Sequence, residues 1–345
     1  MEHRVLGRTG VRVSAYCLGT MMFGSWGNPD ADECVKMIHR AMDAGINFID
    51  TADVYSKGES EEIVGKALSV RRDHVVLATK VHGRMGQKPN QGGNSRLWIM
   101  REVERSLRRL GTDYLDLYQM HRPDPSVDLE ETLGALTDLV RQGKVRYAGC
   151  SAYPAWQIVE SHWVSERRGL ERFVTEQPPY SIFVRGIERD VLPVTRRYGM
   201  GVLVYSPLNG GWLAGRYRKG RENPADSRAE LMKERGRFRE RYDREREPVR
   251  RKLDLVERLE EVAEGAGLSL ARMAMAFVLA HPDVTSAIVG PRTPEQLEEL
   301  LEGADTRLTS DVLDAIDEVV PPGTLVDDAD QGWEGPWMET ASRRR

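Results

Sequence analysis

The feature that most constrains the fold of this chain is a repeat, in which short apolar runs alternate with longer segments of helical period. The predicted strands cover residues 15–18, 48–50, 75–79, 115–118, 147–150, 173–176, 201–205 and 286–289. The predicted helices cover 31–44, 59–68, 96–110, 130–141, 155–168, 187–198, 253–266 and 294–301. Eight strands, each followed by a helix, predict an α/β fold of the closed (β/α)8 TIM barrel type.

Other signals add to this barrel. Glycines 7 and 10 predict an N-terminal β-hairpin, and residues 269–281 and 311–319 have the period of extra C-terminal helices. A doubly wound sheet is the alternative, but it usually carries a GxGxxG fingerprint after its first strand, and this sequence has none. We therefore expect one barrel domain over residues 1–320 and a C-terminal tail over 321–345.

Composition narrows the function classes. A net charge of -4 over 345 residues gives no broad field for nucleic acid or an anionic membrane, and no run of about 18 apolar residues predicts a membrane span. The N-terminus lacks the pattern of a signal peptide. Cys17, Cys34 and Cys150 are widely spaced and predict neither disulfides nor a metal site. We expect a cytoplasmic protein without metal, nucleic acid or membrane partners.

Two segments allow more than one interpretation. Residues 216–251 are dense in charge and follow the seventh strand, so they form either a flap over a cofactor or a solvated helix. The tail from residue 321 carries two tryptophans among acidic and glycine residues. It either folds over the barrel mouth or frays, and its composition slightly favours fraying.

Polar residues stand at the ends of several predicted strands, which is where a barrel builds its active site. Asp50 closes the second strand, Tyr55 lies in the loop after it, Lys80 follows the third strand and His121 follows the fourth. Each has an ordinary explanation when taken alone, such as a helix cap or a solvated loop histidine. Together, at successive strand ends, they predict a catalytic site.

The chemistry of these four residues supports that prediction. Burying Lys80 is costly unless a carboxylate neutralises it, and Asp50 on the neighbouring strand is the expected partner. A cation beside Tyr55 favours the phenolate, so we expect a tyrosine pKa lowered from about 10 and a usable general acid. The imidazole of His121 can donate a hydrogen bond to a carbonyl oxygen and polarise it.

Several stretches carry a family resemblance. They include Asn-Phe-Ile-Asp-Thr-Ala-Asp-Val-Tyr at 47–55, Leu-Ala-Thr-Lys at 77–80, Leu-Asp-Leu-Tyr-Gln-Met-His at 115–121, Tyr-Ser-Pro-Leu at 205–208 and Gly-Pro-Arg-Thr-Pro-Glu-Gln-Leu-Glu-Glu at 290–299. In order and spacing, over nearly the whole chain from residue 4 to about 320, the sequence resembles the aldo-keto reductases, in particular their bacterial and potassium-channel β-subunit-like branch.

The resemblance implies a function and a cofactor. It implies that Asp50, Tyr55, Lys80 and His121 form the catalytic tetrad and that NADPH lies across the barrel mouth without a Rossmann domain. Matching the family motifs residue by residue assigns the cofactor site to Gly19, Thr20, Met21, Ser151, Gln177, Tyr205, Ser206, Leu208, Gly210, Arg216, Gly290, Arg292, Gln296 and Glu299. Arg292 suits a 2′-phosphate, which favours NADPH over NADH.

Two positions depart from the family pattern. Ala152 and Leu300 stand where asparagine is common in relatives, so we expect altered cofactor affinity and intact chemistry. The aromatic residues Phe23, Trp26 and Trp98 are candidate substrate contacts, and packing explains each of them equally well.

The substrate expected from the resemblance is a small carbonyl compound, with a keto-sugar as one candidate by analogy. Two other functions stay open. One is an NADPH-binding regulatory subunit with little turnover, as in the channel β subunits. The other is a sugar isomerase or metal-dependent lyase, which would need a phosphate loop or clustered metal ligands that the sequence does not display. The oligomeric state is open, with a monomer slightly favoured.

Overall fold

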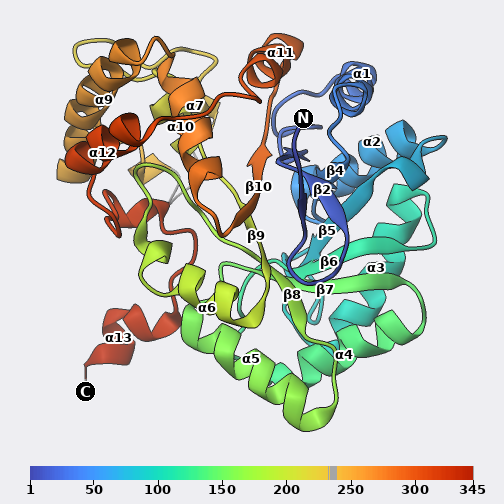
Figure 1. Ribbon diagram of the computed structural model, residues 1–345. Coiled ribbons are helices and arrows are strands. Elements are labelled where there is room, and N and C mark those ends of the chain that lie inside the picture. The colour runs from blue at the N-terminus through green and yellow to red at the C-terminus, as the bar shows by residue number, and fades with distance from the viewer. Residues whose placement is uncertain (232, 234–238, 345) are drawn as a thin grey trace.

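A computed structural model describes residues 1–231, 233 and 239–344. Its centre is a closed barrel of parallel strands in the order β10-β3-β4-β5-β6-β7-β8-β9 (Figure 1). These strands are β3 (Tyr16–Gly19), β4 (Phe48–Asp50), β5 (Val76–Val81), β6 (Leu115–Met120), β7 (Val145–Ser151), β8 (Phe173–Gln177), β9 (Gly201–Val204) and β10 (Val284–Val289). The predicted TIM barrel is therefore confirmed, strand for strand.

Helices surround the barrel on its outside (Figure 1). The α-helices are α1 (Ala31–Asp43), α2 (Glu59–Leu68), α3 (Arg96–Leu110), α4 (Leu129–Arg141), α5 (Ala155–Arg168), α6 (Val191–Tyr198), α7 (Arg228–Leu231), α9 (Glu247–Gly265), α10 (Leu270–Ala280), α11 (Pro294–Glu302), α12 (Ser310–Val319) and α13 (Thr340–Arg343). Short 3-10 turns are η1 (Tyr55–Gly58), η2 (Arg72–His74), η3 (Gly186–Glu188), η4 (Asn209–Ala214), η5 (Asp328–Asp330) and η6 (Pro336–Met338).

Two helices differ from their predicted ranges for local reasons. The helix α9 begins six residues before the predicted start, because Pro248 in its first turn, and not the first apolar residue, marks its beginning. The predicted helix 187–198 is split. Asp190 accepts a hydrogen bond from the Val191 backbone N–H at 2.7 Å and starts α6 there, after the separate turn η3.

The N-terminal hairpin pairs β1 (His3–Val5) with β2 (Arg12–Ser14) in antiparallel register. Its Leu6 and Val13 are fully buried and belong to a small apolar cluster with Cys17, Phe48 and Leu117 from the barrel strands. The hairpin therefore closes the amino-terminal end of the barrel. A separate, larger core of aliphatic and aromatic side chains lies between the strands and the surrounding helices.

The alternation of side chains along each strand determines what lines the barrel. Phe48 fills the closed end, and Asp50 comes two residues later on the same face of β4. In the same way Ala78 is followed by Lys80 on β5, and Leu117 by Gln119 on β6. The strand register places Lys80 opposite Gln119 and Ser151 opposite Gln177. Polar side chains therefore collect at the carboxyl end of the barrel.

The tail packs against the barrel, which corrects the expectation of a frayed terminus. Val326 donates a backbone hydrogen bond to the Phe183 carbonyl at 3.0 Å, and Val326, Asp327, Ala329 and Asp330 are all buried. Gly332 reaches the cavity at the barrel mouth. Of the two interpretations of the tail, the structure therefore supports folding over the mouth.

No single described helix is both long and apolar enough to cross a membrane. Only α9 and α10 taken together meet the length and composition criteria, and the two are bent by 87° where they join.

Candidate active site

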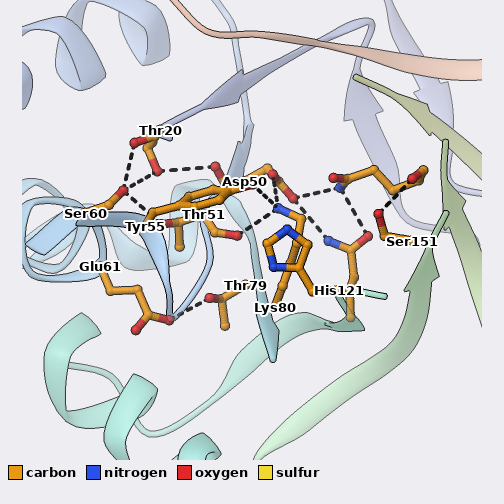
Figure 2. Close-up of polar contacts among 12 residues, drawn as sticks. Thr20, Asp50, Thr51, Tyr55, Ser60, Glu61, Thr79, Lys80, His121 and Ser151 are labelled. Carbon is orange, nitrogen blue, oxygen red and sulfur yellow. Dashed lines mark hydrogen bonds and ion pairs between the residues drawn. The ribbon is translucent and has the colours of Figure 1, made fainter. Parts of the chain in front are cut away.

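A buried lysine organises the site at the carboxyl end of the barrel (Figure 2). The side chain of Lys80 is 0% exposed and forms an ion pair with the Oδ1 of Asp50 on the neighbouring strand. Its ammonium group also donates to the Thr51 carbonyl at 2.9 Å and to the Tyr55 hydroxyl at 3.4 Å. All three donors of the ammonium group are therefore used, and the predicted Lys80–Asp50 pair is present.

Two glutamine amides orient the carboxylate of Asp50. Its Oδ2 accepts hydrogen bonds from Gln177 Nε2 at 2.9 Å and from Gln119 Nε2 at 3.1 Å. Since Oδ1 faces Lys80, the carboxylate is fixed on both sides. Gln119 is a site residue that the motif matching missed. Its place on β6, two residues after the inward-facing Leu117 and two before His121 in the loop that follows, could have revealed it.

Tyr55 lies in a tight turn directly after β4. Ser56, Lys57 and Gly58 have φ values of 47°, 58° and 104°, so three residues in a row adopt the left-handed conformation. The hydroxyl of Ser56 donates to the Phe23 carbonyl at 3.1 Å and accepts from the Trp26 backbone N–H at 3.1 Å. These bonds fix the turn, and with it the place of the Tyr55 ring beside Lys80.

The pKa of Tyr55 differs from the expected direction. Desolvation by the surrounding protein raises the tyrosine pKa above its ordinary value, and Lys80 lowers it only in part. The prediction of a lowered pKa was therefore wrong for this state of the protein, because burial outweighs the cation. The phenol stays protonated. Because Lys80 donates to the hydroxyl oxygen, the phenol's own proton remains available to another acceptor.

His121 lies beside Lys80 and Tyr55, with its ring at 79° to the tyrosine ring and the two centroids 5.6 Å apart (Figure 2). Burial lowers the His121 pKa well below its ordinary value, and the nearby charges of Arg122 and Lys80 act in the same direction. The imidazole is therefore neutral at physiological pH and can serve as a hydrogen-bond donor without being an acid. All four predicted tetrad residues are brought together.

Asp50, Tyr55 and His121 line a cavity of about 640 Å³, whereas Lys80 is buried and absent from its wall. Thirteen of the fourteen predicted cofactor residues line it: Gly19, Met21, Ser151, Gln177, Tyr205, Ser206, Leu208, Gly210, Arg216, Gly290, Arg292, Gln296 and Glu299. The exception is Thr20, whose hydroxyl shares a hydrogen bond with Ser60 at 2.8 Å and whose backbone N–H donates to the Asp50 carbonyl at 3.0 Å. Thr20 therefore helps to fix the backbone of Asp50 and does not itself line the cavity.

Of the three candidate substrate contacts, one lines the cavity and two lie in the core. Trp26 lines the cavity, with its ring centroid 6.2 Å from that of Tyr55. Phe23 and Trp98 lie in the hydrophobic core, where they are 0% and 1% exposed. We therefore carry only Trp26 forward as a substrate contact. Apolar periodicity alone does not distinguish a ring at a cavity from a ring in the core.

The segment after η4 bends over the same cavity. Asp226, Ser227, Arg228, Leu231 and Arg241 line it, and of these only the segment as a whole was expected from the sequence. The predicted flap, 216–251, includes residues 232 and 234–238, which lie outside the described residues. The part that is described supports the interpretation of a flap against that of a solvated helix.

The flap is joined to the barrel by a shared carboxylate. Asp226 accepts from Arg216 at 2.5 Å and from Arg292 at 3.3 Å, so one acid bridges two of the predicted cofactor arginines. Arg228, a third cation on the cavity wall, lies near Met21 and Gly210. The motif matching missed it, since it falls in a stretch of charged residues where no pattern singles it out.

The cavity has features that fit a dinucleotide. The Tyr205 hydroxyl and the Asn209 Oδ1 are buried and have no hydrogen-bond partner among the described residues. Asn209, Gly210 and Gly211 have φ values of 47°, 68° and 100°, and the Asn209 and Gly211 backbone N–H groups donate to the Ser206 and Leu208 carbonyls at 2.8 and 3.0 Å. Arg216 and Arg228 lie against this turn, and with Arg292 on the same cavity wall they suit the phosphates of an extended dinucleotide.

The chain matches known proteins along nearly its whole length. The model of the "Aldo/keto reductase family" matches residues 15–321. An uncharacterised oxidoreductase of Bacillus subtilis, YrpG, is 37% identical over 94% of this chain and 97% of its own length. A Schizosaccharomyces pombe protein, named as a candidate voltage-gated potassium channel β subunit, is 37% identical over 92% of both chains.

Named enzymes are among the relatives as well. The versiconal hemiacetal acetate reductase of Aspergillus parasiticus is 34% identical over 94% of this chain and 98% of its own length. The family match, the relatives and the barrel agree with one another. The chain belongs to the aldo/keto reductase family of oxidoreductases.

Proposed function

We propose that this protein reduces an aldehyde or ketone to the alcohol, with NADPH as the hydride donor and Tyr55 as the proton donor. The observation that carries the proposal is the contact of the buried Lys80 with Asp50 and Tyr55, which line the cavity, with the neutral ring of His121 beside them. NADPH, when bound, supplies the hydride, and every other requirement falls to the protein.

Tyr55 is suited to give a proton to the substrate oxygen. Its raised pKa keeps the phenol protonated, and its hydroxyl oxygen already accepts from Lys80, so its proton can point into the cavity. When the proton leaves, the nearby ammonium stabilises the phenolate that remains. Burial would lower the pKa of Lys80, but Asp50 and Tyr55 together raise it above its ordinary value, so the lysine keeps its charge during the reaction.

The residues that would hold NADPH follow from the cavity wall. Tyr205 offers a ring against which the nicotinamide can stack, and Ser151 and Gln177 lie beside it with polar groups for the carboxamide. Arg216, Arg228 and Arg292 supply cations for the pyrophosphate and the 2′-phosphate, which favours NADPH over NADH. These assignments are proposals built on the places of the side chains.

The test is a titration followed by turnover. We expect NADPH to bind with a change in its nicotinamide fluorescence and to be oxidised when 4-nitrobenzaldehyde is added. Tyr55→Phe should lower kcat by about 10²–10⁴-fold while NADPH still binds, because only the proton donor is lost. A variant that keeps most of its activity would refute the role of Tyr55.

Tyr118→Phe is the matched control. Tyr118 is fully buried, its hydroxyl has no partner among the described residues, and it is absent from the cavity wall. Removing its hydroxyl changes a tyrosine without touching the site, so turnover should stay near that of the parent protein.

The second candidate function is an NADPH-binding regulatory subunit, and the 37% identity to the candidate channel β subunit supports it. The two functions differ in turnover. Tight NADPH binding with negligible oxidation by a broad panel of aldehydes and ketones would favour the regulatory role, and no binding at all would exclude the cofactor assignment.

A further inference from the structure

Arg122 follows His121 directly and lines the same cavity as Tyr55 and Trp26. Its Nη1 donates to the His121 carbonyl at 2.9 Å and to the Ser151 hydroxyl at 3.4 Å. These two bonds hold the guanidinium at the wall of the cavity, half-buried. Within the described part of the chain, neither Nε nor Nη2 donates to a protein acceptor, so two donor positions remain for a ligand.

Three other arginines on the cavity wall are paired with acids. Arg216 and Arg292 share Asp226, as described above, and Arg272 pairs with Glu302 at 2.8 Å. Over the described ranges of the chain, Arg122 forms no ion pair with any carboxylate. Arg228, near Gly210, likewise forms no ion pair within the described residues, but Arg122 is the cation without a contacting acid that directly follows His121.

Glu176 is a nearby acid, and the charge of Arg122 acts to lower its pKa. Glu176 is fully buried and accepts from the Tyr153 backbone N–H at 3.1 Å and from the Cys150 thiol at 3.0 Å. Burial raises its pKa to about 7, which weakens its negative charge at neutral pH. Within the described residues, no ion pair joins Glu176 to Arg122.

We infer that Arg122 selects carbonyl substrates that carry a carboxylate group. A planar guanidinium with two donor positions left suits a carboxylate, because the two can form parallel hydrogen bonds. Trp26 and Val54, on the same cavity wall, supply apolar surface for the body of such a substrate. The Arg122 guanidinium also lies 5.9 Å from the centroid of the Tyr205 ring. The inference rests on the proposed reductase function and adds a substrate class to it, whereas a neutral keto-sugar would offer the cation no opposite charge.

Two other roles for Arg122 make different predictions. If it stabilised the oxygen that becomes negative during reduction, it would assist charged and neutral aldehydes alike. If it held the nicotinamide carboxamide next to Ser151, its loss would weaken NADPH binding and leave no preference among aldehydes. The experiment therefore compares two substrates of nearly the same shape and also measures cofactor affinity.

We would measure kcat/KM for 4-carboxybenzaldehyde and for its uncharged amide, 4-carbamoylbenzaldehyde, in the parent protein and in Arg122→Gln. We expect the parent to prefer the carboxylate, and Arg122→Gln to lower the ratio of the two kcat/KM values by about tenfold or more, as loss of a charge-assisted pair requires. Arg84→Gln is the matched control. Arg84 is exposed, lies in the loop after β5 and donates only to the Gln87 and Lys88 carbonyls.

Binding provides a readout that does not depend on turnover. Calorimetry with the protein in NADP+ should give tighter binding of 4-(hydroxymethyl)benzoate than of 4-(hydroxymethyl)benzamide, and Arg122→Gln should remove the difference. If the protein binds the carboxylate more tightly but reduces no aldehyde, the proposed reductase function is refuted and the carboxylate site at Arg122 is still supported.

Three results would overturn the inference. In the first, Arg122→Gln lowers both kcat/KM values equally, as a stabiliser of the developing charge would. In the second, the loss appears in the dissociation constant for NADPH. In the third, the parent protein does not prefer the carboxylate in either measurement, or Arg84→Gln changes the ratio as much as Arg122→Gln does.

Discussion

Lys80 and Lys252 are both 0% exposed, and they show how the same buried charge is used in two regions of one chain. Lys80 pairs with Asp50 and donates its other two hydrogen bonds to the Thr51 carbonyl and to the hydroxyl of Tyr55, a residue that lines the cavity. Lys252 on α9 pairs with two acids of the tail, Asp327 at 3.0 Å and Asp330 at 2.6 Å.

The surroundings of the two lysines explain the difference. Near Lys252, Arg246 lies 3.1 Å from Asp327 and Arg241 lies 3.4 Å from Asp330, so the acids are shared among several cations. We call Lys252, Asp327 and Asp330 the tail clamp. None of the three clamp residues lines the cavity, whereas Lys80 contacts Tyr55, a phenol on the cavity wall. A buried lysine indicates a reactive site only when such a group lies beside it.

Replacing each lysine with methionine should give the largest effects and the clearest test of this comparison. Lys80→Met should lower kcat by about 10²–10⁴-fold, because Tyr55 loses the cation that stabilises its phenolate. Lys252→Met should instead lower the free energy of unfolding by about 3 kcal/mol, because it leaves two buried carboxylates with fewer partners. Steady-state kinetics on folded protein and urea unfolding measure the two quantities.

The control removes the clamp's acids along with its lysine. Lys252→Met combined with Asp327→Asn and Asp330→Asn should regain part of the lost stability, because no buried carboxylate is left without its lysine, while Arg246 and Arg241 are partly exposed to water. If Lys252→Met lowers kcat as strongly as Lys80→Met while stability is unchanged, the two regions do not differ in the way described.

The second prediction concerns pH and has a smaller effect. Reduction needs Tyr55 in its protonated form, and the raised pKa extends that form to higher pH. The kcat/KM for reduction should therefore fall only above the ordinary tyrosine range of about pH 10. Lys80 lowers this pKa, so the residual activity of Lys80→Met should fall at a still higher pH. A fall centred near neutral pH in the parent protein would contradict the assignment of Tyr55.

The smallest prediction concerns backbone strain, which the site has and the tail clamp lacks. Ala152 and Ser206 have φ values of 58° and 56°, whereas no clamp residue has a positive φ. The left-handed conformation destabilises an alanine by about 1–2 kcal/mol. A glycine variant removes this strain, but glycine also raises the entropy of the unfolded chain, which cancels part of the gain. Ala152→Gly should therefore raise the free energy of unfolding by up to about 1 kcal/mol, measured in urea. A loss of stability would show that Ala152 is not strained.

The order of strands and helices and the tetrad could be predicted from the sequence because both depend on local patterns. Alternating apolar runs place Asp50 and Lys80 on adjacent strands, and the barrel then brings them together. The pKa of Tyr55 could not be predicted, because its direction depends on how much water the folded protein excludes. Phe23, Trp98 and Trp26 are all large aromatic residues, so their identity does not show which of them lines the cavity. Only the packing shows that Phe23 and Trp98 lie in the core and Trp26 at the cavity.

The tail was harder to predict for a different reason. Its acids looked solvated, since the partner Lys252 lies 75 residues away in the sequence and inside a helix of otherwise ordinary pattern. Long-range pairs of this kind leave no local periodicity. The same holds for Asp226, whose two arginine partners lie on either side of it in the chain.

The position of Gly332 has a consequence for how the protein is made. A Cβ atom at this position would lie 2.2 Å from the Tyr205 hydroxyl, so only glycine fits there. The tail therefore completes the cavity wall with the backbone of Gly332 packed against Tyr205. The ribosome synthesises all of the barrel strands before it reaches this segment. A nascent chain with a closed barrel would therefore still lack part of its site, and it would gain its full affinity for a ligand only after the tail had left the ribosome.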